Sequence, residues 1–335
     1  MTTALTTNAT PTAFASIGFD ASILAGQVGQ SSIDMYARDF AEYHNADGTG
    51  WCDREGYNPL APATFARFRA HLASETTLSK KPPHKPYSPN TINRMLTSIR
   101  SVMLAAAEQG FIDRETADGF RDLKGVKPAA LRDRMKPANG RHRIEPDDMR
   151  CILDKPDTTK LVGLRDAALL ATLQSSGLRV SELVSLTVGN LTTTKGKRGQ
   201  VAYLLTGIMG KGQSEPRDAY ISVEAYNRIM AWLNARPVMS QYIFTGINDG
   251  LHGNVIAPTA EPISAVSAWK LVQRYAKRCG LTHISTHDFR RFVGTQLAAD
   301  DIRKAQKALG HKDINTTARH YVLDSLEPGL TDNLC

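Results

Sequence analysis

The chain has few of the residues that mark secreted, zinc-binding or membrane proteins. Its 335 residues include four cysteines, far apart and without a CxxC pair: Cys52, Cys151, Cys279 and Cys335. This usage favours the reduced thiols of a cytosol over a disulfide framework or a zinc site. No apolar run approaches the length of a membrane span, and no basic residue precedes Arg38, so we expect neither a signal nor a transit peptide. These absences predict a cytoplasmic protein.

The N-terminal end of the chain also has very little charge. Asp20 is the only charged side chain in the first 30 residues, which are rich in Ala, Thr and Gly. Such a segment cannot readily bury enough apolar surface to fold alone. We therefore expect residues 1–30 to form a flexible arm.

Positive charge is present in excess and is concentrated in one stretch. The formal net charge is +8, and residues 121–143 contain eight Lys or Arg against two acidic residues. A basic stretch favours an anionic partner, either nucleic acid or a membrane surface, although a solvated surface loop would have the same composition. Pro128, Pro137 and Gly140 predict an extended linker. Its candidate DNA contacts are Lys124, Lys127, Arg132 and Arg134.

Helical patterns precede this linker. Apolar residues recur at helical spacing from Ile33 to Tyr43, with Ser31 or Ser32 as a candidate N-cap, and a second helix is expected over 62–72. Ser88-Pro89 then places a capping serine and a first-turn proline before a third apolar stripe. Residues 31–120 are therefore predicted to form an all-α domain.

The pattern after the linker changes from helical to alternating and back. Residues 164–173 read as a buried helix, and a short helix is expected over 181–186. Alternating apolar residues around 201–205 and 219–223 then flank the turn-forming residues 209–213, which predicts a β-hairpin with Lys211 near its tip. The fold class is thus mainly α with a small antiparallel β-sheet.

Four short segments carry the candidate chemistry, in this order: Gly177-Leu178-Arg179, Gly210-Lys211-Gly212, His287-Asp288-Phe289-Arg290, and Leu309-Gly310-His311 followed by Tyr321. This ordered set resembles the tyrosine recombinase (phage integrase-like) family over the chain from about residue 30. The resemblance implies a two-domain DNA clamp. Its parts would be a core-binding domain (31–120), a basic linker (121–143), and a catalytic domain with a C-terminal tail (144–335).

The resemblance assigns the cationic residues to the scissile phosphate. Arg179 and Arg290 would grip it, because a guanidinium offers planar bidentate donors and stays charged. Lys211 resembles the general acid that protonates the leaving 5′ oxygen. Glu182 would support the site from one helical turn away. Taken singly, Arg179 could be a surface ion-pair partner and Lys211 a solvent-facing turn lysine.

The remaining assignments concern proton transfer and the nucleophile. His287 resembles a proton acceptor or phosphate ligand, and His311 a donor to a non-bridging oxygen, although a lone histidine is more often structural. Tyr321 resembles the nucleophile and is the only tyrosine after Tyr275. Two departures concern local geometry: Tyr321 follows His311 by one residue more than the family usually shows, and Arg291 stands where a histidine is common.

The resemblance implies site-specific recombination through a 3′-phosphotyrosine, with no cofactor, metal or ATP. The partners would be double-stranded DNA and three further copies of the chain, which together form a homotetramer on two duplexes. When bound to DNA, the protein would be associated with the nucleoid. The apolar tail after Tyr321 would dock on a neighbouring protomer. Two other functions stay open: a type IB topoisomerase-like nicking-closing enzyme, and a non-catalytic sequence-specific DNA-binding protein.

Overall fold

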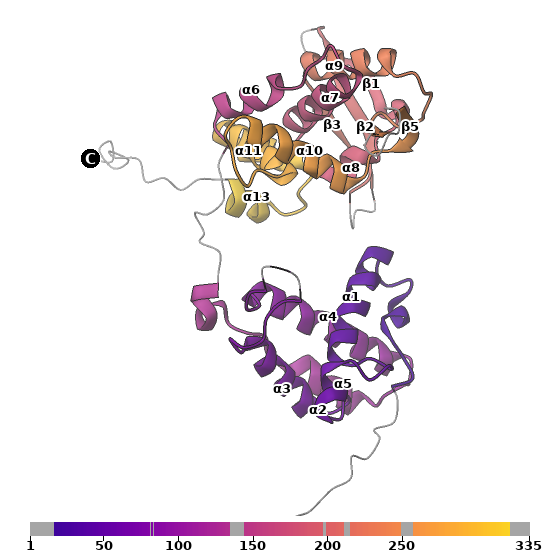
Figure 1. Cartoon of the computed structure of the whole chain (residues 1–335), viewed down its shortest axis with the longest axis vertical. Coiled ribbons are helices and arrows are strands. Elements are labelled where there is room, and N and C mark those ends of the chain that lie inside the picture. The colour runs from indigo at the N-terminus through magenta and orange to yellow at the C-terminus, as the bar shows by residue number, and fades with distance from the viewer. Residues whose placement is uncertain are drawn as a thin grey trace, which may run out of the picture. The chain divides into compact units, whose positions relative to one another are not determined.

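The computed structural model describes residues 17–80, 82, 84–134, 144–196, 199–210, 215–248 and 257–321 (Figure 1). The chain divides into two compact units, residues 1–138 and 139–335. Both are mainly helical, and the second also holds two small antiparallel sheets, which confirms the predicted fold class. Among the described residues, no helix is both long and apolar enough to cross a bilayer.

The first unit is all-helical and begins earlier than predicted. Its elements are η1 (Ala21–Leu24), α1 (Gln30–Tyr43), α2 (Trp51–Glu55), α3 (Pro62–Ala73), α4 (Pro89–Glu108), α5 (Arg114–Asp122) and η2 (Pro128–Arg134). The Ser88 side chain accepts the N–H of Thr91 and caps α4, as predicted. The cap of α1 is Gly29 rather than either serine. The helices bury one apolar cluster that includes Phe40, Phe65 and Phe68.

Parts of the predicted flexible arm and of the predicted extended linker belong to this unit instead. The expected arm is wrong for residues 17–30, because η1 buries Ala21 and Leu24 in the core. The expected linker is wrong for residues 121–134. Arg100 donates to the carbonyl of Leu123, and Asn93 exchanges two hydrogen bonds with the backbone of Val126. Residues 1–16 and 135–143 lie outside the described residues.

The second unit surrounds a buried central helix, α7 (Leu161–Ser176). The other elements are α6 (Pro146–Asp154), α8 (Val180–Val184), η3 (Val188–Asn190), β1 (Leu191–Lys195), β2 (Val201–Ile208), β3 (Arg217–Ile221), α9 (Val223–Ala235), β4 (Thr245–Asn248), β5 (Ala257–Pro262), α10 (Ala265–Arg278), α11 (Thr286–Asp300), α12 (Ile302–Leu309) and α13 (Ile314–Tyr321). Helix α7 packs against α9, α11 and β3. It ends at Gly177, whose left-handed backbone lets the chain turn toward Arg179.

The predicted hairpin is confirmed as β2 and β3, which pair antiparallel with Leu205 opposite Ala219. Both of these side chains are buried. The alternating pattern stops at Ile221, because Ser222 caps α9 and Val223 already belongs to that helix. Strand β1 completes a three-stranded sheet, and β4–β5 form a second one; neither addition was predicted.

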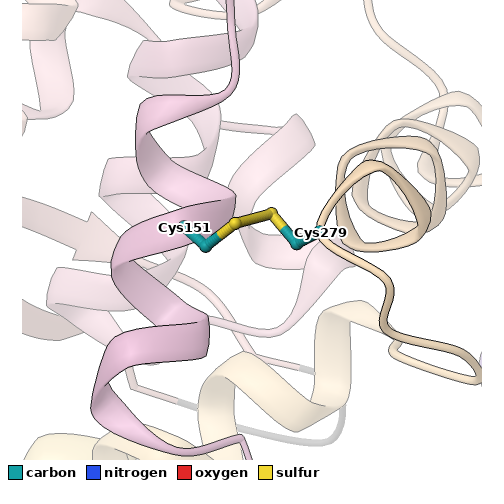
Figure 2. Close-up of a disulfide and its surroundings, with 2 residues drawn as sticks. All are labelled: Cys151 and Cys279. Carbon is teal, nitrogen blue, oxygen red and sulfur yellow. A yellow bond between two sulfur atoms is a disulfide. The ribbon is translucent and has the colours of Figure 1, made fainter.

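A disulfide joins two elements of the second unit that are far apart in sequence. Cys151 of α6 and Cys279, which follows α10, are bonded across a separation of 128 residues (Figure 2). Their Cα atoms are 6.1 Å apart, within the usual disulfide range. The expectation that the thiols are all reduced is therefore wrong for this pair. Cys52 is buried in the first unit as a free thiol.

Reducing the protein is expected to destabilise the second unit. A cross-link over a loop of this length restricts the unfolded chain, and its loss is expected to lower the unfolding free energy by about 5 kcal/mol. Urea unfolding with and without a reductant measures this, and Cys151→Ser should match the reduced wild type. Cys52→Ser is the control that should keep the response to reductant. If the unfolding free energy of the oxidised protein does not change when a reductant is added, the expectation is contradicted.

Candidate active site

Arg290 is the buried centre of the candidate site. It lies on α11 and is 1% exposed. Its guanidinium donates to the carbonyls of Gly177 (2.7 Å) and Leu309 (2.5 Å), which end α7 and α12. Burial and the charge of Arg179 lower the pKa of Arg290 to about 10, so it remains a cation at neutral pH. A fixed positive charge therefore lies where three helices meet.

Glu182 on α8 is shared by two further arginines. Its carboxylate is 1% exposed and accepts from Nη1 of Arg179 and from Nη2 of Arg217, each at 2.8 Å. It also accepts the backbone N–H of Arg179. Burial alone would raise the pKa of Glu182, but this N–H and the charges of Arg217 and Arg179 lower it, so the carboxylate is ionised. The carboxylate therefore joins Arg179 and Arg217, and its charge also acts to raise the pKa of Arg290.

Tyr321 lies inside the second unit at the end of α13. It is 3% exposed, and its ring stacks against the ring of His311, with centroids 5.6 Å apart. The ring fills space beside α11 that only a glycine leaves open, because a Cβ on Gly294 would lie 2.4 Å from Tyr321 Cδ1. The longer spacing from His311 therefore does not turn Tyr321 outward.

His311 connects the tyrosine to Arg290. Its Nε2 lies 3.1 Å from Nη2 of Arg290, and its Nδ1 lies 2.9 Å from the hydroxyl of Thr317. A guanidinium can only donate, so Nε2 accepts and the proton of a neutral His311 lies on Nδ1, toward Thr317. Thr317 was not anticipated from the sequence. It is fully buried on α13, which carries Tyr321.

His287 opens α11 one turn before Arg290, with its side chain at the surface of the unit. Desolvation by the surrounding protein and the charges of Arg291 and Arg290 lower the pKa of His287. At neutral pH it is therefore mainly uncharged and able to accept a proton. Arg291, at the position where a histidine is common, donates to the carboxylate of Asp288.

Not every predicted site residue can be placed. Lys211 lies outside the described residues, in the segment that connects β2 to β3. Of the four predicted DNA contacts, Lys124, Lys127 and Arg132 are exposed. Arg134 is not, because its side chain is 8% exposed and its Nη2 lies 4.0 Å from Glu75. In this structure Arg134 is not free to reach a phosphate.

The main residue that the sequence analysis missed is Arg217. It belongs to no motif, and its partner Glu182 lies 35 residues away. The only signal was a basic residue two positions before the strand predicted over 219–223. In the part of the chain that the structure describes, no three His, Cys, Asp or Glu side chains come together as a candidate metal site.

A family model and curated relatives agree on what this chain is similar to. Residues 142–326 match the phage integrase family. Tyrosine recombinase XerC of Azotobacter vinelandii is 27% identical over 307 residues, which cover 89% of this chain and 87% of that protein. Tyrosine recombinase XerD of Neisseria meningitidis serogroup B is 36% identical over 169 residues. There, the match spans about half of each protein: 50% of this chain and 53% of the relative.

Solved structures share the fold. A Tn1549 transposon integrase in complex with a circular intermediate DNA aligns over 93% of this chain and 98% of that one, with a TM-score of 0.59 and 14% identity. XerH site-specific recombinase bound to a palindromic difH substrate aligns over 87% of this chain and 76% of that one, with a TM-score of 0.56 and 17% identity. The family match spans more than half of the chain, so this protein belongs to the phage integrase family, the tyrosine recombinases.

Proposed function

We propose that this protein is a site-specific recombinase that cleaves and rejoins DNA through a covalent bond to Tyr321. One observation carries the proposal: three side chains from different elements meet in one place. They are the buried Arg290 of α11, His311 between α12 and α13, and the buried Tyr321 of α13. Arg290 contacts His311, and His311 stacks on Tyr321. A phenol is a poor nucleophile until it loses its proton, and a cationic pocket favours that loss.

The proposed reaction needs only the residues of this site. The Tyr321 oxygen attacks the scissile phosphorus and passes its proton to a neutral acceptor, for which His287 is the candidate. Arg179 and Arg290 offset the charge of the pentacoordinate phosphorane. The bond to the 5′ oxygen breaks, and Lys211 protonates that oxygen. A 5′ hydroxyl from the partner duplex reverses these steps, so the phosphotyrosine conserves the bond energy and no ATP is needed.

The assembly that we propose follows from the need for two duplexes. Four protomers would act in pairs, with the two units of each chain clamping one DNA site. Lys124, Lys127 and Arg132 would contact the phosphate backbone. The exposed positions of these three side chains support this role. We also propose that the protein acts in the cytoplasm on chromosomal or mobile-element DNA.

A covalent-capture experiment tests the function. Host genomic fragments are incubated with the protein, and DNA that stays attached after denaturation is sequenced to find the site. A nicked duplex carrying this site should trap an adduct, and two intact duplexes should exchange strands. Excess chelator should leave cleavage intact, because arginines and a lysine supply the positive charge. Absence of any adduct would indicate a binding protein, and adducts without strand exchange a nicking-closing enzyme.

The salt dependence of DNA binding tests the basic segment. Each lost phosphate contact lowers the slope of log affinity against log salt by about 0.9, so Gln at Lys124, Lys127 and Arg132 should lower it by up to about 2.7. Arg134→Gln is the matched control within the same segment. It should leave the slope unchanged, because the Arg134 side chain is buried. If the triple variant keeps the wild-type slope, these three residues do not contact DNA phosphates and the segment is only a solvated loop.

A further inference from the structure

Arg217 connects two parts of the candidate site through one side chain. Its Nη2 donates to Oε2 of Glu182 (2.8 Å), and its Nη1 donates to the carbonyl of Ala308 (3.1 Å). The first partner lies on α8 and the second on the last turn of α12. The side chain is 11% exposed, so this bridge is well shielded from water. Arg217 itself starts β3, the strand that follows the Lys211 segment.

The first branch of the bridge leads to Arg179. Glu182 Oε2 accepts both from Arg217 and from the backbone N–H of Arg179, while Oε1 accepts from the Arg179 guanidinium. Both oxygens of the carboxylate therefore accept hydrogen bonds, and the bonds from Arg179 and Arg217 together fix the orientation of its plane. The Arg179 side chain is 37% exposed, so its guanidinium is partly open to a ligand. The direction of that guanidinium depends on the orientation of Glu182.

The second branch leads to His311. Gly310 has a left-handed backbone (φ +65°), and a Cβ there would lie 2.6 Å from Cδ and 2.9 Å from Nε of Arg217. The Arg217 side chain thus occupies the space beside Gly310 and bonds to the carbonyl of Ala308, two residues before it. His311 follows directly and contacts Arg290. Arg217 therefore braces the turn from which His311 reaches the site.

We infer that Arg217 is a positioning residue that sets Arg179, through Glu182, and His311, through the Gly310 turn. The inference rests on the proposed function. Arg217 does not touch the reacting atoms. It holds Arg179, which would bind a non-bridging phosphate oxygen, and the turn that carries His311, which contacts the phosphate-binding Arg290. Its loss should therefore slow cleavage while DNA affinity stays nearly unchanged.

The test compares Arg217→Met with Arg217→Lys. The substrates are a nicked duplex with a normal scissile phosphate and one with a methylphosphonate, in which a methyl group replaces a charged oxygen. Arg217→Met should cleave the phosphate roughly 100-fold more slowly and the methylphosphonate less than about 10-fold more slowly, because the neutral group needs less charge stabilisation. Arg217→Lys should recover part of the loss, since one ammonium can still pair with Glu182.

Arg228→Met is the matched control. Arg228 also bridges a backbone carbonyl, that of Leu153, and two carboxylates, those of Asp154 and Glu224. None of these partners belongs to the candidate site, so cleavage of both substrates should match the wild type. Equal losses on both substrates for Arg217→Met, or no loss, would overturn the inference. If the wild type forms no adduct, the proposed function fails first and the inference fails with it.

A second variant tests the Gly310 branch independently. Gly310→Ala should displace Arg217 and reproduce the selective loss on the phosphate substrate. If both changes act through the same contact, the double variant Gly310→Ala/Arg217→Met should cleave no more slowly than the slower single variant. Multiplicative losses would show that Gly310 and Arg217 act separately, which would refute this branch.

Discussion

Tyr321→Phe protein is expected to bind its DNA site with wild-type affinity and to form no covalent adduct. Phe keeps the ring that stacks on His311 and fills the space beside Gly294. Only the hydroxyl is removed, so unfolding free energy should fall by no more than about 1.5 kcal/mol. Cleavage should fall by roughly 10⁴-fold or more, because no other group supplies the nucleophile. Adducts are measured on denaturing gels, and affinity by titration.

A second tyrosine serves as the control for this experiment. Tyr226 stacks on Tyr203 in the same unit, with ring centroids 4.0 Å apart. Tyr226→Phe should form adducts at the wild-type rate. An adduct formed by Tyr321→Phe protein would mean that another side chain attacks the phosphate, and the assignment of Tyr321 would be wrong.

Arg290→Lys is expected to lose both activity and stability. A lysine has one ammonium and cannot reach Gly177, Leu309 and His311 together, so buried acceptors lose their donors. Unfolding free energy should fall by about 2–4 kcal/mol. The cleavage rate should fall by about 1,000-fold, because a planar donor for the phosphate is lost. Single-turnover cleavage and urea unfolding measure the two effects.

Arg165→Lys separates the two effects. Arg165 is also buried and also multiply bonded, to Asp166 and to the carbonyl of Thr245. Its loss should cost similar stability. Below the unfolding transition its cleavage rate should stay within about threefold of the wild type, since none of its partners belongs to the site. Equal losses of cleavage in the two variants would mean that Arg290 acts only through stability.

The sequence predicted those helices and strands whose boundaries depend on interactions between residues close together in the chain. Ser88-Pro89 marks a helix start because capping involves residues within one turn, and α4 begins there. The motif order also predicted which residues would gather, and Arg179, Arg290, His311 and Tyr321 do lie around α11. Lys211 and the roles of all these residues remain predictions.

Contacts between distant residues could not be predicted in this way. The disulfide spans 128 residues, and Arg217 meets Glu182 across 35, so neither pair leaves a periodic signal. Arg134 was predicted to contact DNA because the side chains of a stretch of charged residues normally face solvent. Its burial depends on how η2 packs within the first unit, and composition contains no information on that packing.

The shielding of Tyr321 bears on how the protein behaves between encounters with DNA. A phenol that is 3% exposed is shielded from electrophiles in solution, such as iodinating or nitrating reagents. In the proposed reaction, the same shielding would keep the Tyr321 hydroxyl away from phosphodiesters outside the recognised site. If Tyr321 is the nucleophile, it would become accessible only in the DNA complex, so its burial would limit cleavage at other sites independently of sequence recognition.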